Sequence, residues 1–541
     1  MSTPTRYVSD MSSNTKEDRS DKPDNGDISI GDSIAVDERS VFERKMELVN
    51  AEIDKLGLGK YQWCIWFLCG MGFFIDLALV QGVSLMASAV FQEMGVPAGR
   101  QGLLYTCSNT GLAIGAFGFG VITDIIGRKW AFQLTCLITA IFGMLMAASK
   151  YNYGAICGIY FLSCIGLGGN IPIDAAIALE FLPKNRRYLV ALLSMWQPIG
   201  VVVACGIAYG TAARYRCDVD LPSCTAVDDG EACCTVSSNM GWRYLVIIIG
   251  AMSLAIFCAR YLLFSFYESP KFLVSQGREQ DAIEVLHKIA KFNKAEPPTL
   301  TIEDFRHIDL EVRDPRGQPQ ETTSSAKAVI MDAIRSLGFL RGLFLSKKQC
   351  FSFVLLALSY MGNYWSFTLA GYFLPIILLN NNVDSGAHNV TDTYQQYIYI
   401  YLPGIIGAVV ALFSIQIPLV GRKWSLVISA SLQGLSMAMY TQVKTTAGYV
   451  GLNALEYIMQ SYFNAVLYSA APEMFDTAYR ASASGMLSCL GRIAGIVAPF
   501  AGQKYIDQGS SGVLWLGAGG IWLAAFLLCF LPVEMRNKQM Y

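Results

Sequence analysis

The chain has 541 residues, of which 53% are hydrophobic and 15% are charged, and its formal net charge is −1. Soluble domains carry about 25% charged residues, so this composition excludes an ordinary soluble protein and places most of the chain in lipid. The near-neutral charge excludes a nucleic-acid footprint. The three histidines all lie between apolar segments, which excludes an intramembrane histidine relay.

The first 60 residues are rich in Asp, Glu, Lys and Ser and lack the apolar stretch of a secretory signal. Residues 1–60 are therefore expected to form a cytosolic tail that is largely disordered. The last part of this tail, Val41 to Leu58, has the pattern of a short amphipathic helix at a membrane surface.

From Tyr61 onward, apolar runs long enough to cross about 30 Å of hydrocarbon recur between charged or Gly- and Pro-containing stretches. A polar stretch at residues 268–350 divides them into two halves, at 61–267 and 351–532, and is expected to be a cytosolic linker with short helices. Residues 533–541 are expected to form a second cytosolic tail. The predicted fold is an all-α membrane protein with twelve transmembrane helices in two six-helix halves. The predicted spans are 62–90, 102–122, 130–149, 153–178, 189–212, 243–266, 351–378, 395–417, 423–441, 448–470, 482–503 and 512–532.

Basic residues mark alternate short loops, for example Arg128 with Lys129 in one loop and Arg422 in another. The positive-inside rule places these loops, and with them both termini, in the cytosol. The loop at residues 214–240 is then outside, where disulfides persist, and so is the glycosylation sequon at Asn389. Both features require the secretory route, so the plasma membrane is the expected location, with a vacuolar or other secretory-route membrane as the alternative.

Eleven of the 15 cysteines lie in or beside apolar segments and are expected to be small buried hydrophobes. The other four, Cys217, Cys224, Cys233 and Cys234, lie in the loop at residues 214–240. At least one disulfide is expected there, from Cys217, Cys224 and one of the adjacent pair Cys233 and Cys234. The two adjacent cysteines are too close in sequence to pair easily with each other.

Two motifs recur at nearly the same offset along the chain. Gly127-Arg128-Lys129-Trp130 recurs as Gly421-Arg422-Lys423-Trp424 at an offset of 294 residues. An acid placed seven residues before an arginine recurs at an offset of 293, as Glu180 with Arg187 and as Glu473 with Arg480. This repeat predicts duplicated halves related by an axis along the membrane normal.

Several of these residues resemble the motifs of a known transporter superfamily. Gly120-x-x-x-Asp124-x-x-Gly127-Arg128-Lys129 resembles the loop signature of major facilitators, and Glu268-Ser269-Pro270-Lys271-Phe272-Leu273 followed by Gly277-Arg278 resembles the sugar-porter signature. Three further stretches resemble the branch that contains synaptic-vesicle-glycoprotein-like transporters and their fungal relatives: Phe73-Phe74-x-Asp76, Gly168-Gly169-Asn170-x-Pro172 and Gly491-Arg492-x-x-Gly495. The similarity covers roughly residues 50 to 535, and it implies that spans one, four, seven and ten line a central cavity.

Two positions depart from relatives within this branch. Phosphate and niacin transporters of the branch carry a second acid three residues after the first-span aspartate, where this chain has Leu79. The phosphate transporters also carry an acid where this chain has Asn170. Phosphate and organic-cation substrates are therefore disfavoured.

Few charged residues lie within the spans, where each ionised side chain costs about 3 kcal/mol at the bilayer centre. Asp76, in the first span, is the candidate proton-coupling acid, because a carboxylate desolvated in a closing cavity can have its pKa raised toward neutrality. The competing interpretation is a fixed buried ion pair between Asp76 and Arg492. Glu456, in the tenth span, is the alternate coupling acid. Arg260 is expected near the cytosolic face, where its side chain can extend to the headgroups.

Polar stripes identify candidate substrate-binding residues. Glu456, Gln460 and Asn464 recur every four residues, so they share one face of a helix, as do Asn170 and Asp174 in span four. The alternative role for such stripes is hydrogen bonding between helices. The forked donors of Arg492 suit a substrate carboxylate, whereas Tyr364 and Trp365 suit a ring-bearing or polyol solute and have packing as their alternative. The complete predicted set is Asn170, Asp174, Arg492, Gln460, Asn464, Tyr364 and Trp365.

The repeated loop motifs are expected to form cytosolic charge locks that hold the halves in an outward-open state and break on switching. The expected pairs are Asp124 with Arg128, and Glu180 and Glu473 with Arg187 and Arg480. Charges that only set the topology would explain the arginines but not the acids. The complete predicted gating set is Asp124, Gly127, Arg128, Lys129, Glu180, Arg187, Arg422, Glu473 and Arg480.

The sequence contains no GxxxxGK[ST] loop, which disfavours an ATP-driven pump, and no HExxH or comparable cluster, so no enzyme activity, cofactor or metal is expected. The expected function is secondary active transport of a small polar organic solute, as a monomeric proton-coupled symporter for a carboxylate or sugar-like substrate. Two alternatives remain open. One is a proton-driven exporter of metabolites or drugs, and the other is a nontransporting receptor that kept the transporter fold.

Overall fold

The computed structural model of the protein describes residues 30–218, 221–227, 231–264, 266–312, 347–380, 390–443, 445–475, 480–506 and 512–532. Every regular element of these described ranges is helical, and the only extended pairing among them is an isolated bridge between Ser223 and Cys234. The sequon at Asn389 and the predicted tail at residues 533–541 lie outside the described residues.

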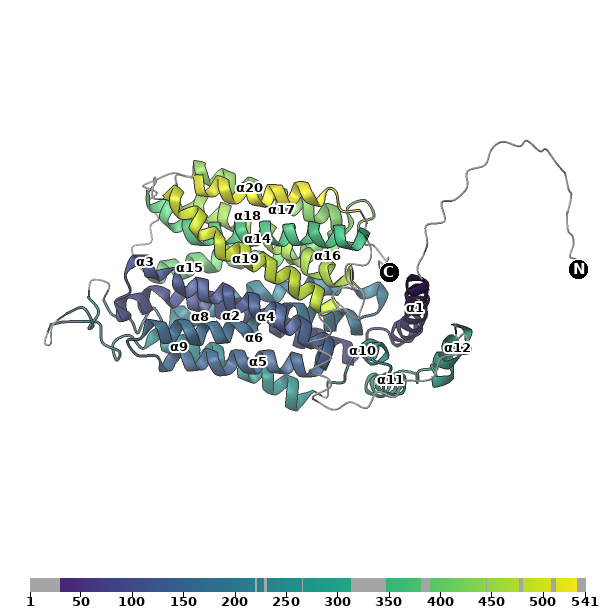
Figure 1. The fold of residues 1–541 in the computed structure, drawn as a ribbon. Coiled ribbons are helices and arrows are strands. Elements are labelled where there is room, and N and C mark those ends of the chain that lie inside the picture. Colours follow the sequence, from purple (N-terminus) through teal and green to yellow (C-terminus); the bar gives the residue numbers. More distant parts are fainter. Residues whose placement is uncertain are drawn as a thin grey trace, which may run out of the picture.

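The predicted spans of the N-terminal half fall on helices that pack side by side in the lower part of Figure 1. The second of them is preceded by the short helix α3 (Ala98–Gln101), and the fifth is built from α7 (Leu189–Leu192) and α8 (Trp196–Gly210), which follow one another with a turn of 3₁₀ helix between them. The other five are α2 (Lys60–Met94), α4 (Leu103–Ile126), α5 (Arg128–Leu145), α6 (Tyr153–Phe181) and α9 (Gly241–Cys258).

The C-terminal half lies above the first half in Figure 1 and repeats its helical arrangement. Its second span is divided into α15 (Val390–Tyr401) and α16 (Gly404–Ser414), because Pro403 stands between them and cannot donate a helical hydrogen bond. The other five helices are α14 (Lys347–Asn380), α17 (Gly421–Met439), α18 (Thr446–Glu473), α19 (Arg480–Ile506) and α20 (Gly512–Leu528).

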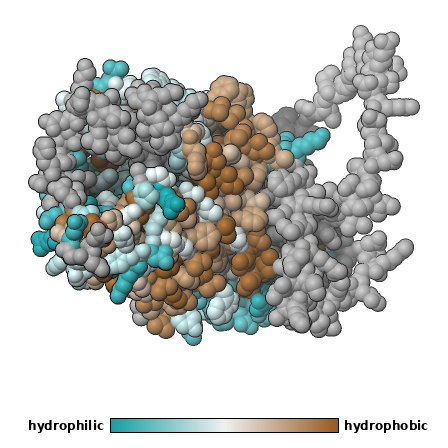
Figure 2. All heavy atoms as spheres, turned by 60° about the vertical axis from the view of Figure 1, so that its left-hand side comes forward, coloured by the Kyte–Doolittle hydropathy of each residue, from teal (hydrophilic) through white to brown (hydrophobic). Residues whose placement is uncertain are grey.

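The described helices have the length and composition of membrane spans. Eight described stretches are long and apolar enough to cross a bilayer, and α20 is a shorter apolar helix. Large apolar side chains such as Trp130, Phe413 and Phe526 are exposed along the sides of the helices. Figure 2 shows this brown, apolar surface over the sides of the helices, with teal, hydrophilic residues around its margins. An apolar outer surface of this extent is what contact with lipid tails requires.

The two ends of the bundle carry different structures. At one end, on the right of Figure 1, lie α1 (Ile30–Leu56), α10 (Pro270–Ser275), α11 (Glu279–Asn293) and α12 (Ile302–Val312). We call this end the linker end. The opposite end carries the loop at residues 211–240 and is called the disulfide end.

The helix α1 packs on protein rather than lying freely as a tail. Its apolar residues Met46, Val49 and Ile53 are buried, and its Lys45 reaches both Glu279 of α11 at 3.0 Å and Asp309 of α12 at 2.8 Å. The amphipathic pattern predicted for Val41 to Leu58 is therefore present, but linker helices cover its apolar face. A stable docking surface of this kind supplies the packing that an isolated helix lacks in water.

All four loop cysteines at the disulfide end form disulfides, so the prediction of at least one bridge is confirmed. Cys217 pairs with Cys234, and Cys224 pairs with Cys233. The adjacent cysteines thus take separate partners, as their spacing predicted.

The two halves approach most closely through α4 and α19, in the part of the bundle nearer the linker end. A Cβ atom at Gly485 would lie 2.3 Å from the carbonyl oxygen of Ala116, and one at Gly120 would lie 2.8 Å from that of Ala481. Small residues therefore let the two backbones touch. The central space between the halves is closed toward the linker end by this contact.

Candidate functional site

A cavity of about 510 Å³ lies between the two halves, a volume typical of small-molecule sites. Its lining comes from α2, α4, α6, α8, α14, α15, α18 and α19, together with the loop at the disulfide end. Asp76 and Arg492 mark the middle of the bundle, whereas Ser88 and Tyr105 lie near the ends of α2 and α4 at the disulfide end. The cavity therefore extends from the middle of the bundle toward the disulfide end.

Asp76 is buried in the wall of this cavity, on α2. Its Oδ1 atom accepts a hydrogen bond of 3.1 Å from the amide Nδ2 of Asn170 on α6. Its Oδ2 atom is buried without a hydrogen-bond donor. Within the described ranges no cation forms an ion pair with Asp76, so the fixed pair with Arg492 is not formed in this conformation.

Arg492 reaches the same cavity from α19, and its side chain is 6% exposed. Its guanidinium carbon lies 5.1 Å from the ring centroid of Tyr364, a cation–π contact. Its Nε atom is buried without an acceptor, and no described carboxylate pairs with it. The flanking Gly491 allows close packing on α14, because a Cβ there would lie 2.6 Å from the Tyr364 ring. Arg492 is thus a buried cation without a described anionic partner.

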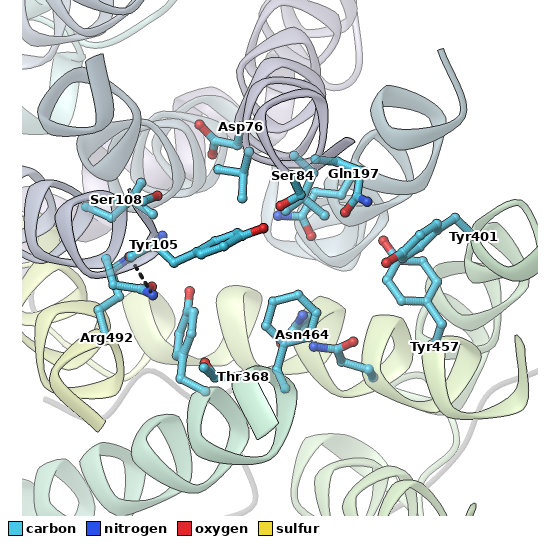
Figure 3. A pocket seen from close by; sticks show the side chains of 18 of the residues that line it. Asp76, Ser84, Tyr105, Ser108, Gln197, Thr368, Tyr401, Tyr457, Asn464 and Arg492 are labelled. Atoms are coloured by element: carbon cyan, nitrogen blue, oxygen red, sulfur yellow. Dashed lines mark hydrogen bonds between the residues drawn. The ribbon is translucent and has the colours of Figure 1, made fainter. Parts of the chain in front are cut away.

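The remaining lining combines aliphatic side chains with polar and aromatic ones. The Nδ2 atom of Asn363 donates to the Oδ1 atom of Asn464 at 2.8 Å, and Gln460 lines the same wall. Across the cavity, the rings of Tyr401 and Tyr457 meet edge to face with centroids 4.5 Å apart. Figure 3 shows these two tyrosines on the side opposite Arg492, with Tyr105 pointing into the space between.

Four predicted coupling or substrate residues lie outside the lining: Glu456, Trp365, Asp174 and Asn170. Glu456 accepts a hydrogen bond of 3.0 Å from Gln433 of α17, and Trp365 donates its Nε1–H to the carbonyl of Leu516 at 3.3 Å. Residues four apart on an α-helix point in directions that differ by about 40°. Asn464 is two such steps after Glu456, so Glu456 faces α17 while Asn464 faces the cavity. Trp365 is the next residue after Tyr364, which lines the cavity. One residue turns the helix by about 100°, so the side chain of Trp365 faces α20.

Asp174, the third of these residues, forms a buried ion pair of 3.2 Å with Arg260, and both side chains are fully buried. The expectation that Arg260 extends to the headgroups is therefore wrong. Its guanidinium also donates to the carbonyls of Phe132 at 2.9 Å and Leu68 at 2.7 Å. The pair joins α2, α5 and α6 inside the N-terminal half and leaves Asp174 away from the cavity.

Asn170, also in the predicted substrate set, is fully buried and acts on the cavity through its hydrogen bond to Asp76. Lining residues that the sequence did not indicate include Tyr105, Tyr401 and Tyr457. Each is a tyrosine, a residue type that also serves as an interface anchor in membrane proteins. No sequence signal separated these two roles.

The predicted charged motifs meet at the linker end, where the expected pair of Asp124 and Arg128 forms, but Glu180 and Glu473 have different partners from those expected. Arg128 pairs with Asp124 at 3.1 Å and with Glu180 at 3.0 Å, all three fully buried. The repeat-related Arg422 pairs with Glu473 in the C-terminal half. The acids therefore pair with the loop arginines within their own half, rather than with Arg187 and Arg480.

Arg187 and Arg480 make other contacts. Arg187 donates to Asn50 of α1 at 3.4 Å, and Arg480 donates to the carbonyl of Pro472 at 2.7 Å. Asp124 adds a hydrogen bond to the contact between the halves, because its Oδ2 atom accepts the backbone N–H of Ser482 at 2.7 Å. Asp124 thus joins the Arg128 network to the start of α19.

The loop after α4 needs a glycine at Gly127. Its φ of 111° lies in the region that side chains rarely adopt. A Cβ there would also lie 2.5 Å from the carboxylate of Glu268, which accepts the backbone N–H groups of Arg128 at 2.8 Å and Lys129 at 3.2 Å. The nearby Lys271 of α10 is buried, and this burial, with Arg187 and Arg480 close by, lowers the pKa of its amine well below the usual range.

Helices in two repeated halves, around a central cavity that is closed at one end, define a membrane transporter of the major facilitator class. Residues 64–541 match the family described as sugar (and other) transporter. The chain belongs to this family and is a transporter rather than an enzyme.

Relatives along the whole chain are transporters from several fungi and from animals. An uncharacterized MFS-type transporter of Schizosaccharomyces pombe is 32% identical over 96% of this chain and 93% of its own. The MFS siderochrome iron transporter 1 of Ceriporiopsis subvermispora is 30% identical over 92% of both chains. A synaptic vesicle 2-related protein of Xenopus laevis is 22% identical over 91% of this chain and 82% of its own, which agrees with the branch that the motifs indicated.

The fold is also found in solved structures. The proton:xylose symporter XylE, bound to 6-bromo-6-deoxy-D-glucose, matches with a TM-score of 0.65 at 16% identity, over 88% of this chain and 97% of its own. At this identity the likeness shows the shared twelve-helix, two-half fold and nothing about substrate.

Proposed function

We propose that the protein is a proton-coupled symporter of a small organic solute that carries a carboxylate group. The observation that supports this most directly is the charge content of the cavity. Arg492 is a buried cation without a described acid partner, and Asp76 is a buried acid with one oxygen that no donor satisfies. Arg492 binds the substrate carboxylate in this proposal, and Asp76 carries the proton.

The free energy of an unpaired charge explains the role of Arg492. Leaving a buried arginine without a partner costs about 3 kcal/mol or more. A carboxylate with two oxygens offsets this cost by accepting two parallel hydrogen bonds from the guanidinium. The amide groups of Gln460 and Asn464, and the tyrosine walls, are suited to the remaining polar and ring atoms of the solute.

The same charge content gives a reason for coupling. The inner part of the cavity holds one cation and one anion, Arg492 and Asp76, whereas the other charged lining residue, Arg216, belongs to the loop at the disulfide end. Binding a carboxylate alone would leave a net negative charge that is costly to enclose away from water. Protonation of Asp76 restores neutrality, so the enclosed, mobile state holds substrate and proton together.

The chemistry of the two ends supports one orientation in the membrane. Disulfides persist in oxidising compartments, which favours an outside location for the disulfide end. The basic loops lie at the linker end, which favours a cytosolic location for that end. The cavity then faces outward. The pairs of Arg128 and Arg422 hold each half rigid, and the contact from Asp124 to Ser482 breaks when the halves exchange sides.

Uptake into cells that express the protein tests the proposed function. The panel contains labelled monocarboxylates, hexoses, polyols and nicotinate, each at two external pH values about one unit apart. We expect a carboxylate to accumulate, more at the lower external pH, and to lose uptake in Arg492→Gln. Uptake of a neutral hexose that does not depend on Arg492 would overturn the proposal. Acid-stimulated efflux would indicate the exporter, and no flux from a correctly folded surface protein would indicate the receptor.

A further inference from the structure

One residue of the cavity lining comes from a loop. Arg216 belongs to the loop at the disulfide end, between α8 and α9, yet it lines the cavity together with residues of the helices. The side chain is partly buried, and its Nε atom is buried without an acceptor. Within the described ranges its guanidinium makes no hydrogen bond and no ion pair.

The backbone is fixed on both sides of Arg216. The carbonyl oxygen of Tyr215 accepts the N–H of Gly241, which begins α9, at 2.8 Å. Cys217 is joined to Cys234 by a disulfide. The next carbonyl, that of Asp218, accepts Nε2 of Gln92 on α2 at 2.7 Å. The loop therefore holds Arg216 at the mouth of the cavity instead of leaving it on a free segment.

Another cation beneath this loop is neutralised, which sets Arg216 apart. Arg243 of α9 pairs with Glu93 of α2 at 2.6 Å, and both are buried. Glu93 also accepts hydrogen bonds from Trp242 at 2.9 Å and Asn239 at 3.0 Å. This network anchors the end of the loop to α2, and its carboxylate neutralises the charge of Arg243.

We propose that Arg216 is a second cationic element of the cavity, which attracts organic anions to the mouth and selects them over cations and neutral solutes. A cleft with walls of low dielectric concentrates the field of a charge at its opening, and this raises the local concentration of ligands with the opposite charge. The identity of the substrate as an organic anion rests on the proposed function. The positive potential at the mouth does not depend on it.

Charged thiol reagents measure this potential without any substrate. Ser88 lines the mouth, is exposed, and differs from cysteine by one atom, so Ser88→Cys provides a reporter thiol. The rates of its reaction with anionic methanethiosulfonate ethylsulfonate and cationic methanethiosulfonate ethyltrimethylammonium are compared in full-length protein. Protein without Ser88→Cys gives the background from native cysteines, none of which lines the cavity.

Removing the charge with Arg216→Gln should lower the ratio of the anionic to the cationic rate several-fold, because a positive charge near the reporter speeds the reaction of the anion and slows that of the cation. Arg216→Lys should keep the ratio near its original value, because the charge remains. Arg214→Gln is the matched control, since Arg214 carries the same charge in the same loop but is exposed and does not line the cavity. An unchanged ratio in Arg216→Gln, or an equal fall in Arg214→Gln, would overturn the proposal.

A transport measurement separates this inference from the proposed function. Arg216→Gln should raise the KM for an accepted carboxylate several-fold with kcat unchanged, and the effect should fade at high salt because salt screens the charge. If the reagent ratio falls but no carboxylate of the panel is transported, the role of Arg216 at the mouth stands and the proposed substrate class fails. If carboxylates are transported while the ratio is unchanged, the role of Arg216 fails alone.

Discussion

Replacing Asp76 by asparagine distinguishes a proton carrier from a structural ion pair. The amide has the size of the carboxylate and can keep accepting the 3.1 Å hydrogen bond from Asn170. No described cation loses a partner, and the new amide N–H takes the place of the Oδ2 atom, which is already buried without a hydrogen-bond partner. The expected loss of stability is therefore about 1 kcal/mol, compared with about 3 to 5 kcal/mol if half of a buried ion pair were removed.

The effect on coupling is larger and has a defined size. One proton moving down a gradient of about one pH unit supplies about 1.4 kcal/mol, which supports about tenfold accumulation of the solute. An amide imitates the protonated acid permanently and cannot release the proton. Asp76→Asn should therefore still exchange labelled for unlabelled substrate, while accumulation falls from about tenfold to about onefold and the dependence of uptake on external pH disappears.

The assay uses protein reconstituted in liposomes, with a carboxylate that the uptake panel identifies. Accumulation, exchange and thermal unfolding are measured on the same preparation. Glu456→Gln is the control, since Glu456 is a buried acid hydrogen-bonded to Gln433 and does not line the cavity. If Asp76→Asn still concentrated substrate with normal pH dependence, the reasoning would be refuted, and a loss of accumulation in Glu456→Gln would transfer the role to that acid. A large loss of stability in Asp76→Asn would instead show that the pair with Arg492 forms in another conformation.

Four further predictions follow from other parts of the structure. Arg492→Lys should keep the fold but raise the KM for a carboxylate about tenfold, as the loss of one charged hydrogen bond worth about 1.5 kcal/mol implies; an unchanged KM would remove Arg492 from the site. Arg128→Met leaves two buried carboxylates without their cation, so the free energy of unfolding should fall by about 3 to 5 kcal/mol, and an unaltered thermal unfolding midpoint would contradict this. Replacing Cys217 and Cys234 by serine opens a bridge across 17 residues and should destabilise the loop by about 3 kcal/mol, seen as faster proteolysis there; mapping that found free thiols in oxidised protein would contradict the bridge. The lowered pKa of Lys271 means that the unfolded state binds a proton more readily than the folded state. Lys271 therefore lowers the free energy of unfolding at pH values below the usual pKa of lysine, and this destabilisation fades as pH rises. Lys271→Met should therefore be more stable than the parent near neutral pH, by a margin that shrinks in alkaline solution, and a less stable variant at neutral pH would refute this.

The charged residues at the linker end show why pairing was harder to predict than position. The repeat correctly indicated that Glu180 and Glu473 have equivalent roles. Sequence spacing nevertheless favoured Arg187 and Arg480 as partners, whereas the structure joins these acids to Arg128 and Arg422. The loop arginines are distant in sequence and come close only when α6 packs against α5 and α18 against α17. Spacing along a chain carries information about one helix face and little about a neighbouring helix.

The sequence by itself determined that this is a membrane protein with two repeated halves, a cysteine-bridged loop and a chemically different opposite end. These properties depend on hydropathy, local charge and repeat offset, each of which is a sum over neighbouring residues. Only the tertiary structure decided which side chains reach the cavity. Each residue turns a helix by about 100°, so the rotation of a packed helix separates Tyr364 from Trp365 and Asn464 from Glu456. Folding also placed Arg260 on Asp174 and brought Arg216 from a loop to the cavity mouth, because those contacts join segments that are far apart in the chain.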